Sequence, residues 1–230
     1  MPQPFQVYAD GIDFIIFEEF PAGEAALHLK RDFDRNKLFA DPVLEPLHEA
    51  AAFVAADLGY ADAPAVLDGV RDLLAERWAE DALLVGQLRE WLWAEGRLQS
   101  KLVDGKDGQH ADAAKYRDYF DYTEPIRSVP SHRALAVFRG RAQEWLDARL
   151  VQDEQAVPGQ PGLAEGRIAR HLGWRHAGRP GDDLIRKCIA WTWKVKLSLS
   201  LERDLFLRLR EQAEGVAIKV FGDNLRDLLL

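Results

Sequence analysis

The sequence predicts a mainly α protein: a multi-helix scaffold with a small N-terminal β-hairpin and a long C-terminal helix. Several segments carry apolar residues at helical spacing between proline and glycine signals. Near the start, an Asp-Gly pair separates two short runs rich in β-branched and aromatic residues. The last thirty residues keep a helical apolar period.

Composition bounds the class of protein. The chain has 230 residues and 47% hydrophobic content, enough to bury the core of one or two domains. Its single cysteine, Cys188, excludes an intramolecular disulfide framework and fits a reducing compartment. The sequence shows neither an apolar run of about 20 residues nor the pattern of a signal peptide. We therefore expect a cytoplasmic protein.

Charge is unevenly distributed along the chain. Residues 1–162 carry 17 basic and 29 acidic side chains, whereas residues 163–230 carry 13 basic and 9 acidic ones. The acidic front part does not attract phosphate at long range. Contact with nucleic acid is therefore expected to be local or to lie in the C-terminal third, although ordinary variation in surface charge is the favoured explanation of the asymmetry.

The stretch "FQVYADGIDFIIF", residues 5–17, predicts a β-hairpin. Asp10-Gly11 is a favoured two-residue turn, and apolar residues alternate on both sides of it. Because an isolated hairpin is marginally stable in water, we expect it to pack on the helices or on a partner chain.

Helices are predicted from about Leu38 onward. In residues 41–59, Asp41 is a candidate N-cap, Pro42 a first helical residue and Gly59 a stop. Asp62 and Pro64 repeat this pattern. The apolar faces expected of the next two helices consist of Val66, Val70, Leu73, Leu74 and Trp78, and of Leu84, Leu88, Trp91 and Leu92, ending at Gly96.

The middle of the chain mixes loops and helix. Residues 101–115 read as a polar loop or a short hairpin, and residues 122–130 as an extended connector, since Pro125 and Pro130 disfavour helix before them. Ser131 is a candidate N-cap for the helix that follows. Gly140 is a candidate helix breaker, which leaves "EWLDARLV" as a second helix or a strand.

The C-terminal part begins after the proline- and glycine-rich segment "QDEQAVPGQPG". A short helix, a loop and a second helix are expected before the long final helix. One face of the long helix is expected to comprise Leu201, Leu205, Leu209, Ala213, Val216, Val220 and Leu228. Gly215 and Gly222 are candidate kinks or close-packing points.

These elements suggest four segments. Residues 1–37 form an atypical N-terminal segment with the hairpin, and residues 38–150 form a helical region. Residues 151–162 form a linker, and residues 163–230 form a helical region that ends in a long connecting helix.

Catalytic motifs are not found in the sequence. It contains no phosphate-binding glycine loop, no HExxH, no GxSxG and no CxxC. The six histidines are scattered, and the five-residue spacing of His171 and His176 does not suit a metal site on one helix face. Cys188 lies in an apolar-rich helix and is expected in the core. We expect no enzyme activity, no metal and no cofactor.

The stretch "YRDYFDYTEPIRSVPSHRALAVFRGR", residues 116–141, has two readings. Its arginines could contact phosphates while its tyrosines stack on bases. Alternatively, the arginines pair with Asp118, Asp121 and Glu124, and the tyrosines bury their rings with hydroxyls bonded to the backbone. Residues 115–149 carry seven basic and five acidic groups, a near-balance that favours the second reading.

The candidate nucleic-acid contacts are the basic residues of these two regions. They are Arg133, Arg139, Arg167, Arg170, Arg175, Arg179, Lys194 and Lys196. Trp174, Trp191 and Trp193 are candidates for base stacking, with core packing as the alternative, above all for Trp193. The expected partner is RNA or single-stranded DNA, bound weakly.

The same stretch, residues 116–141, together with "WTWKVKLSLSLERDLFLRLREQAEGVAIKVFGDNLRDLLL", resembles the Tex family of bacterial transcription accessory proteins. "VLDGVRDLLAERWAED", "LREWLWAEGRLQSKLV" and "RIARHLGW" fit the same family. The resemblance covers about residues 38–230, and residues 1–37 match nothing expected of the family.

The resemblance implies a central helical scaffold. It implies that the RNase H-like, helix-hairpin-helix and S1 domains of the family, the S1 domain being the one most associated with nucleic acid, lie outside this chain. Gly215 and Gly222 depart from the residues usual in the family at these places. A transcription accessory role, with the transcription machinery as a possible partner, is therefore expected by resemblance. The alternative is a stand-alone protein-interaction module or a remnant without independent activity.

Overall fold

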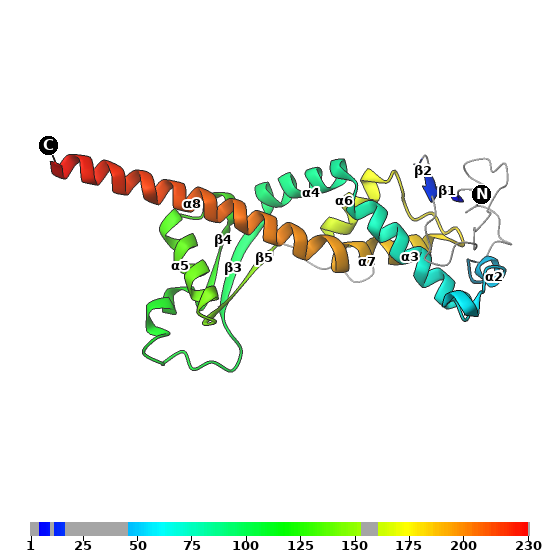
Figure 1. Ribbon diagram of the computed structural model, residues 1–230, viewed down its shortest axis with the longest axis horizontal. Coiled ribbons are helices and arrows are strands. Elements are labelled where there is room, and N and C mark those ends of the chain that lie inside the picture. The colour runs from blue at the N-terminus through cyan, green and yellow to red at the C-terminus, as the bar shows by residue number, and fades with distance from the viewer. Residues whose placement is uncertain (1–4, 10–11, 17–45, 153–160, 230) are drawn as a thin grey trace. The chain divides into compact units, whose positions relative to one another are not determined.

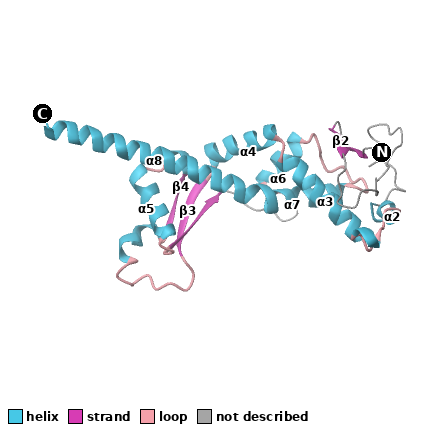
Figure 2. Cartoon of the chain, in the orientation of Figure 1, coloured by secondary structure: helices cyan, strands magenta, loops and turns pink. Residues whose placement is uncertain are grey.

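The computed structural model describes residues 5–9, 12–16, 46–152 and 161–229, and its fold is mainly α, as predicted (Figures 1 and 2). The chain divides into two compact units, each built from two stretches that are distant in sequence. Unit 1 combines Met1–Leu84 with Val157–Leu197, and unit 2 combines Val85–Ala156 with Ser198–Leu230. The sequential segments expected above remain predictions, because each unit joins parts of several of them.

The N-terminal hairpin is confirmed in its two strands. β1 (Phe5–Ala9) pairs antiparallel with β2 (Ile12–Ile16), with Phe5 opposite Ile16 and Ala9 opposite Ile12. This register leaves two residues for the connection, as expected of a tight turn. The Asp10-Gly11 turn itself and the packing of the hairpin side chains lie outside the described residues.

The first predicted helix is shorter than expected. α2 spans Pro46–Ala51, and a separate 3-10 turn, η1, spans Ala56–Leu58. Gly59 ends η1 in the left-handed region with φ 90°, so it stops this 3-10 turn, whereas the predicted helix already ends at Ala51. Ala55 and Tyr60 exchange backbone hydrogen bonds across this turn, which explains why the helix does not run through. The expected Asp41–Pro42 start lies outside the described residues.

Two further helices follow as the sequence predicts. α3 (Ala63–Ala79) starts at Asp62, whose side chain accepts a hydrogen bond from Ala65 N at 2.9 Å. α4 (Ala82–Glu95) starts at Asp81, whose Oδ1 accepts from the backbone N–H groups of both residues 83 and 84. The buried residues of the two predicted faces are Val66, Leu74, Trp78, Leu84, Leu88, Trp91 and Leu92.

Unit 2 contains a three-stranded antiparallel sheet that the sequence did not predict as a whole. β3 (Arg97–Leu102) lies between β4 (Asp121–Pro125) and β5 (Leu146–Val151). The expected loop or hairpin at residues 101–115 overlaps the end of β3, and part of the expected connector is β4. For β5, the strand alternative is confirmed.

Helix α5 (Ser131–Ala142) corrects two expectations. Its N-cap position is Pro130, and no side chain caps it, so the prediction that Ser131 is the N-cap is wrong. The fixed φ of Pro130 and its extended geometry set the start of the helix instead. Gly140 does not break the helix: it is buried, and a Cβ there would lie 2.5 Å from a methyl group of Leu146, so its small size admits β5.

The C-terminal elements complete both units. α6 (Leu163–His171) and α7 (Asp182–Trp191) belong to unit 1, together with a π-helical turn, η4 (Thr192–Leu197). The Thr192 hydroxyl donates to the carbonyl of Cys188 at 2.7 Å inside this turn. Helical structure continues directly from η4 into α8 (Ser198–Leu229) of unit 2.

The predicted apolar face of α8 is buried only in its first half. Leu201, Leu205, Leu209 and Ala213 are at most 4% exposed. Val216 and Val220, which were expected on the same face, are 50% and 53% exposed, and residues 214–226 contain no buried side chain. Neither Gly215 nor Gly222 is a close-packing point, since a Cβ at either would meet no atom within 4 Å.

The different roles of Asp62 and Ser131 at their helix starts can be tested through the free energy of unfolding. We expect Asp62→Ala to lower the free energy of unfolding by about 1 kcal/mol, because Ala65 N loses its acceptor at the start of α3. Ser131→Ala, the matched control, is expected to change it by less than about 0.5 kcal/mol, because its hydroxyl caps nothing. Chemical denaturation of both variants measures this, and equal losses would contradict the assignment of the caps.

A second prediction concerns the end of α5. Glu144 has φ 58°, the left-handed conformation that glycine adopts without cost, and the neighbouring Trp145 N donates to Gly140 O at 2.9 Å. Glu144→Gly should therefore raise the free energy of unfolding by about 1 kcal/mol. Thermal unfolding measures the change. A lower melting temperature than that of the unchanged chain would show that the glutamate side chain contributes more than its backbone costs.

Candidate nucleic-acid interface

The structure distributes the eight predicted contact residues over both compact units. Arg133 and Arg139 lie on α5 of unit 2. Unit 1 holds the other six, on α6, in the loop that follows it and in η4: Arg167, Arg170, Arg175, Arg179, Lys194 and Lys196. Their role in binding stays a prediction. Arg133, Arg179 and Lys196 are paired with carboxylates, and Arg170 and Arg175 are exposed.

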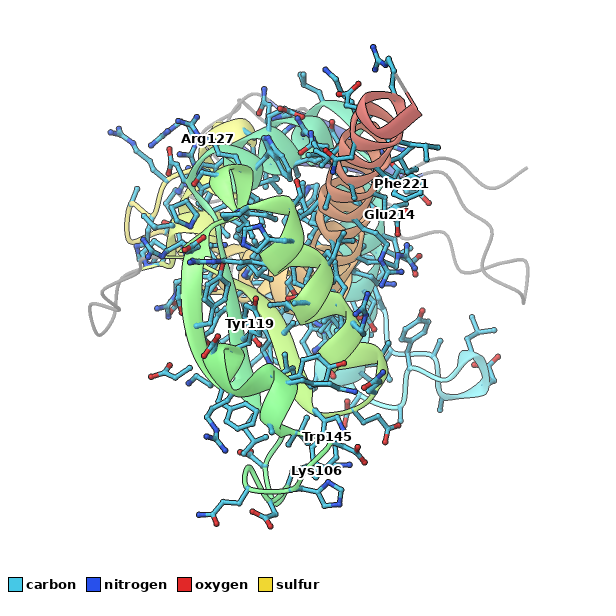
Figure 3. The ribbon with its side chains drawn as sticks, turned by 90° about the vertical axis from the view of Figure 1, so that its left-hand side faces the viewer. Lys106, Tyr119, Arg127, Trp145, Glu214 and Phe221 are labelled. Carbon is cyan, nitrogen blue, oxygen red and sulfur yellow. The ribbon has the colours of Figure 1, made fainter. Side chains whose placement is uncertain are left out.

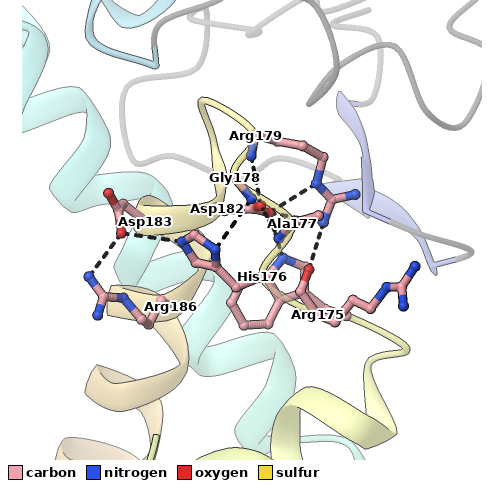
Figure 4. A network of polar contacts seen from close by, with 9 residues as sticks. Arg175, His176, Ala177, Gly178, Arg179, Asp182, Asp183 and Arg186 are labelled. Atoms are coloured by element: carbon pink, nitrogen blue, oxygen red, sulfur yellow. Dashed lines mark hydrogen bonds and ion pairs between the residues drawn. The ribbon is translucent and has the colours of Figure 1, made fainter. Parts of the chain in front are cut away.

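Asp182 organises the loop between α6 and α7. Its carboxylate is fully buried and accepts hydrogen bonds from Ala177 N at 2.7 Å, Arg179 N at 2.9 Å and the Trp174 indole at 3.1 Å. The guanidinium of Arg179 adds two bonds, from Nε at 3.0 Å and Nη2 at 2.9 Å, and also donates to the carbonyl of Arg175 (Figure 4). A single carboxylate therefore closes the loop.

The pKa of Asp182 reflects this environment. Burial alone would raise the pKa, but the hydrogen bonds from Arg179, Ala177 and Trp174 outweigh it and lower the pKa from 3.8 to about 2. The carboxylate is therefore ionised at neutral pH, and it neutralises Arg179. Arg179 faces inward, where it cannot serve a phosphate without leaving a buried charge unpaired.

A histidine–carboxylate contact and a lysine–carboxylate ion pair also join elements of unit 1. His171, in the last turn of α6, contacts Asp81 through Nε2 at 2.9 Å, and Lys196 contacts Glu76 at 3.1 Å. Burial alone would raise the pKa of Asp81, but bonds from Leu84 N and His171 lower it. Lys196 is thus engaged with a carboxylate on α3.

In unit 2, Glu124 joins two other residues of the stretch 116–141 through hydrogen bonds. The carboxylate accepts from the Tyr122 hydroxyl at 2.8 Å and from Arg133 at 2.5 Å. Tyr122 is 9% exposed, and burial together with Glu124 raises the pKa of its hydroxyl. Tyr119 packs edge-on against Tyr122, with 5.4 Å between ring centroids.

This geometry supports the structural reading for Arg133, Tyr116 and Tyr122, and it corrects one detail of that reading. Pairing with Glu124 is confirmed for Arg133, and Tyr116 and Tyr122 are buried. Their hydroxyls bond to side chains, however, since Tyr116 donates to Gln143 at 2.8 Å rather than to the backbone. Tyr119 and Arg127, two members of the stretch, lie at separate places on unit 2 (Figure 3).

Two of the three stacking candidates make contacts within the fold, and Trp193 is only partly buried. Trp174 is 9% exposed and donates to Asp182. The guanidinium carbon of Arg71 lies 4.0 Å from the ring centroid of Trp191. A second aromatic cluster, which the sequence did not suggest, lies in unit 2: Trp145 stacks with His110 at 5.2 Å and carries Lys106 5.1 Å from its ring (Figure 3).

Cys188 is confirmed as a core residue. Its side chain is fully buried, and burial raises the pKa of its thiol to about 12. A thiol in this state is a poor nucleophile at neutral pH. Over the described ranges, histidine, cysteine and carboxylate side chains form no group of three or more that could hold a metal ion. In the same residues, no helix is both long and apolar enough to cross a membrane.

The central role of Asp182 was missed from the sequence. The stretch "GRPGDD" predicts a loop before a helix, but it does not show which aspartate turns inward. Two signals were present: a tryptophan eight residues before Asp182, and an arginine three residues before it, in a loop with glycines at positions 178 and 181.

Asp182 can be tested through pH. A lowered folded-state pKa means that the carboxylate stabilises the fold above about pH 4, and that this stabilisation, about 2 kcal/mol, is lost as the pH falls toward 2. Asp182→Asn should therefore lower the free energy of unfolding at pH 7 by about 2 kcal/mol or more, and the difference from the unchanged chain should shrink at pH 3.

The control is Asp183→Asn. Asp183 is exposed and pairs with Arg186 at 2.8 Å, so its loss should cost less than about 0.5 kcal/mol. Urea denaturation at both pH values measures the two variants. Equal effects at residues 182 and 183 would refute the role of Asp182.

Known proteins resemble this chain over most of its length. The family model described as "Tex central region-like" matches residues 41–221. Protein YhgF of Escherichia coli (strain K12) is 45% identical over 209 residues, which cover 90% of this chain and 27% of that protein. Protein tex of Bordetella pertussis is 43% identical over 85% of the chain, and the transcriptional accessory protein Tex of Neisseria gonorrhoeae is 43% identical over 79%.

The matches cover a small share of each relative but most of this chain. The chain spans about a quarter of the length of these relatives. Only about a tenth of the chain lies outside the match to YhgF, so that match includes part of residues 1–37, for which no counterpart was expected. On the match over residues 41–221 and these identities, the chain belongs to the Tex family and corresponds to its central region.

Proposed function

We propose that this chain is the central helical scaffold of a Tex-type transcription accessory protein and that it contacts nucleic acid weakly, without reading bases. The match to the central region of the family over residues 41–221, with a relative named as a transcriptional accessory protein, carries this proposal. The transcription machinery and RNA or single-stranded DNA are the partners that we propose.

Carboxylate pairing of three predicted contact residues supports a scaffold role for them. Arg133, Arg179 and Lys196 are each engaged by a carboxylate of their own unit. The net charge of the chain is −8, so no strong field draws phosphate to it from a distance. Contacts limited to a few outward-facing arginines give weak binding that is sensitive to salt and indifferent to sequence.

The proposed role is not enzymatic and needs no cofactor. The proposal places it in the cytoplasm, in keeping with a single cysteine that is reduced and buried. It also assigns base-reading to the RNase H-like, helix-hairpin-helix and S1 domains that the family resemblance implies, which we propose lie outside these 230 residues.

A protein-interaction module is the second candidate function. It is supported by apolar side chains that are 46% to 72% exposed on the second half of α8, in the region of Phe221 (Figure 3): Val216, Ile218, Val220, Phe221 and Leu225. Exposed apolar residues in such number on one helix are typical of contact with another protein.

Fluorescence anisotropy with labelled single-stranded RNA and DNA, titrated at several salt concentrations, tests the first function. We expect micromolar or weaker binding at low salt, a steep loss of affinity as salt rises and equal affinities for unrelated sequences. Tight, sequence-selective binding that persists at high salt would contradict the proposal. No binding at low salt would favour the second function.

A further inference from the structure

One segment of unit 1 differs in charge from the chain around it. Residues 163–191, which comprise α6, the loop closed by Asp182 and α7, carry six arginines and lysines against three carboxylates, a net charge of +3. The whole chain has a net charge of −8. The excess of cations is therefore local, which is the pattern expected of a phosphate-binding surface on an acidic protein.

The three carboxylates of this segment are all engaged by the fold. Asp182 is buried against Arg179, and Asp183 pairs with Arg186. Glu165 accepts a hydrogen bond from Gly162 N at the start of α6. None of them compensates the remaining cations of the segment.

Carboxylates on the neighbouring part of unit 1 are engaged as well. On α3, Asp68 and Asp72 both pair with Arg71, and Glu76 pairs with Lys196. Asp81, at the start of α4, pairs with His171. These four carboxylates are therefore already in contact with other basic side chains.

Two of the predicted contact arginines of unit 1 keep an outward-facing charge. Arg170, in the last turn of α6, and Arg175, just after the left-handed Gly173, are exposed, and within the described parts of the chain neither is paired with a carboxylate. The guanidinium of Arg175 points away from the network around Asp182 (Figure 4). The carbonyl of Arg175 accepts from Arg179, so the loop closed by Asp182 holds its backbone in place.

We propose that Arg170 and Arg175 are the phosphate contacts of unit 1 and that their ligand is the phosphodiester backbone of a single-stranded nucleic acid. This inference rests on the proposed function and names the residues through which it acts. The guanidinium groups bind phosphate oxygens and carry no sequence information. Asp182 is a positioning residue: it neutralises Arg179 and fixes the loop, so that Arg175 is presented to solvent.

The test compares two double variants that remove the same formal charge. Arg170→Gln/Arg175→Gln removes both outward-facing arginines. The control, Arg149→Gln/Arg226→Gln, removes two arginines that pair with carboxylates, Asp147 and Asp223. Affinity for a labelled 20-nucleotide oligothymidine is measured by anisotropy at several salt concentrations, and the salt needed to elute each protein from heparin, a polyanion without bases, is measured in parallel.

We expect the Arg170/Arg175 variant to flatten the dependence of log K on log salt by about 1.4, since each phosphate that is no longer neutralised reduces the slope by about 0.7. The same variant should elute from heparin at lower salt. The control variant should keep the slope and the elution of the unchanged chain. Equal slopes and equal elution in the two variants would overturn the assignment of Arg170 and Arg175, while leaving the proposed function in place.

Failure of the proposed function has a different signature. The unchanged chain could fail to bind oligothymidine at low salt while its retention on heparin still depends on Arg170 and Arg175. This result would support the two arginines as polyanion contacts and would refute the nucleic-acid function. If the unchanged chain neither binds oligothymidine nor is retained on heparin, both are refuted. Circular dichroism of each variant confirms that the comparison is made between folded proteins.

Discussion

The buried carboxylate of Asp182 is the constraint on which the charge distribution of unit 1 depends. An ionised carboxylate with no exposure to water is stable only if it is fully hydrogen-bonded. Five hydrogen bonds from Trp174, Ala177 and Arg179 meet that requirement, and they fold the loop between α6 and α7 around the carboxylate. The same arrangement turns Arg179 inward and leaves Arg175 facing outward.

In unit 2, two carboxylates also accept hydrogen bonds that join different elements. Glu124 joins Tyr122 on β4 to Arg133 on α5, and Glu202 on α8 accepts from Leu150 N on β5 at 2.7 Å. Arg89 and Arg208 add pairs with Asp204 and Glu90 between α4 and α8. Three of the eight residues predicted to contact phosphate, Arg133, Arg179 and Lys196, are therefore paired within the scaffold.

Local sequence signals predicted most of the helices. The sheet of unit 2 and the side-chain partners depend on contacts between residues distant in sequence. Asp62 and Gly59 act through groups within three residues, so their roles could be predicted from the sequence. β3 has only Leu98 as a clearly apolar buried residue, and Ser100 on the same face is also buried. Such a short polar strand carries little signal without its partners β4 and β5. Similarly, the partner that Tyr116 finds in Gln143 is 27 residues away.

In the candidate site, too, local features could be predicted from the sequence and contacts distant in sequence could not. Residue type and net charge pointed to the basic residues of the C-terminal third, among them Arg170 and Arg175. Which cations pair with carboxylates could not be predicted, because the partner of Lys196 is 120 residues away and only one of two adjacent aspartates is buried. The helical period of α8 was predicted correctly, but a period does not show where the helix loses its neighbours after Ala213.

The central claim is that Arg179 is paired with the buried Asp182, whereas Arg175 is exposed and free to bind phosphate. Nuclear magnetic resonance of the arginine Nε–H groups tests it most directly, with exchange against solvent measured before and after addition of oligothymidine. The account predicts slow exchange and no shift for Arg179, and fast exchange with a shift on binding for Arg175. A shift at Arg179 with none at Arg175 would contradict it.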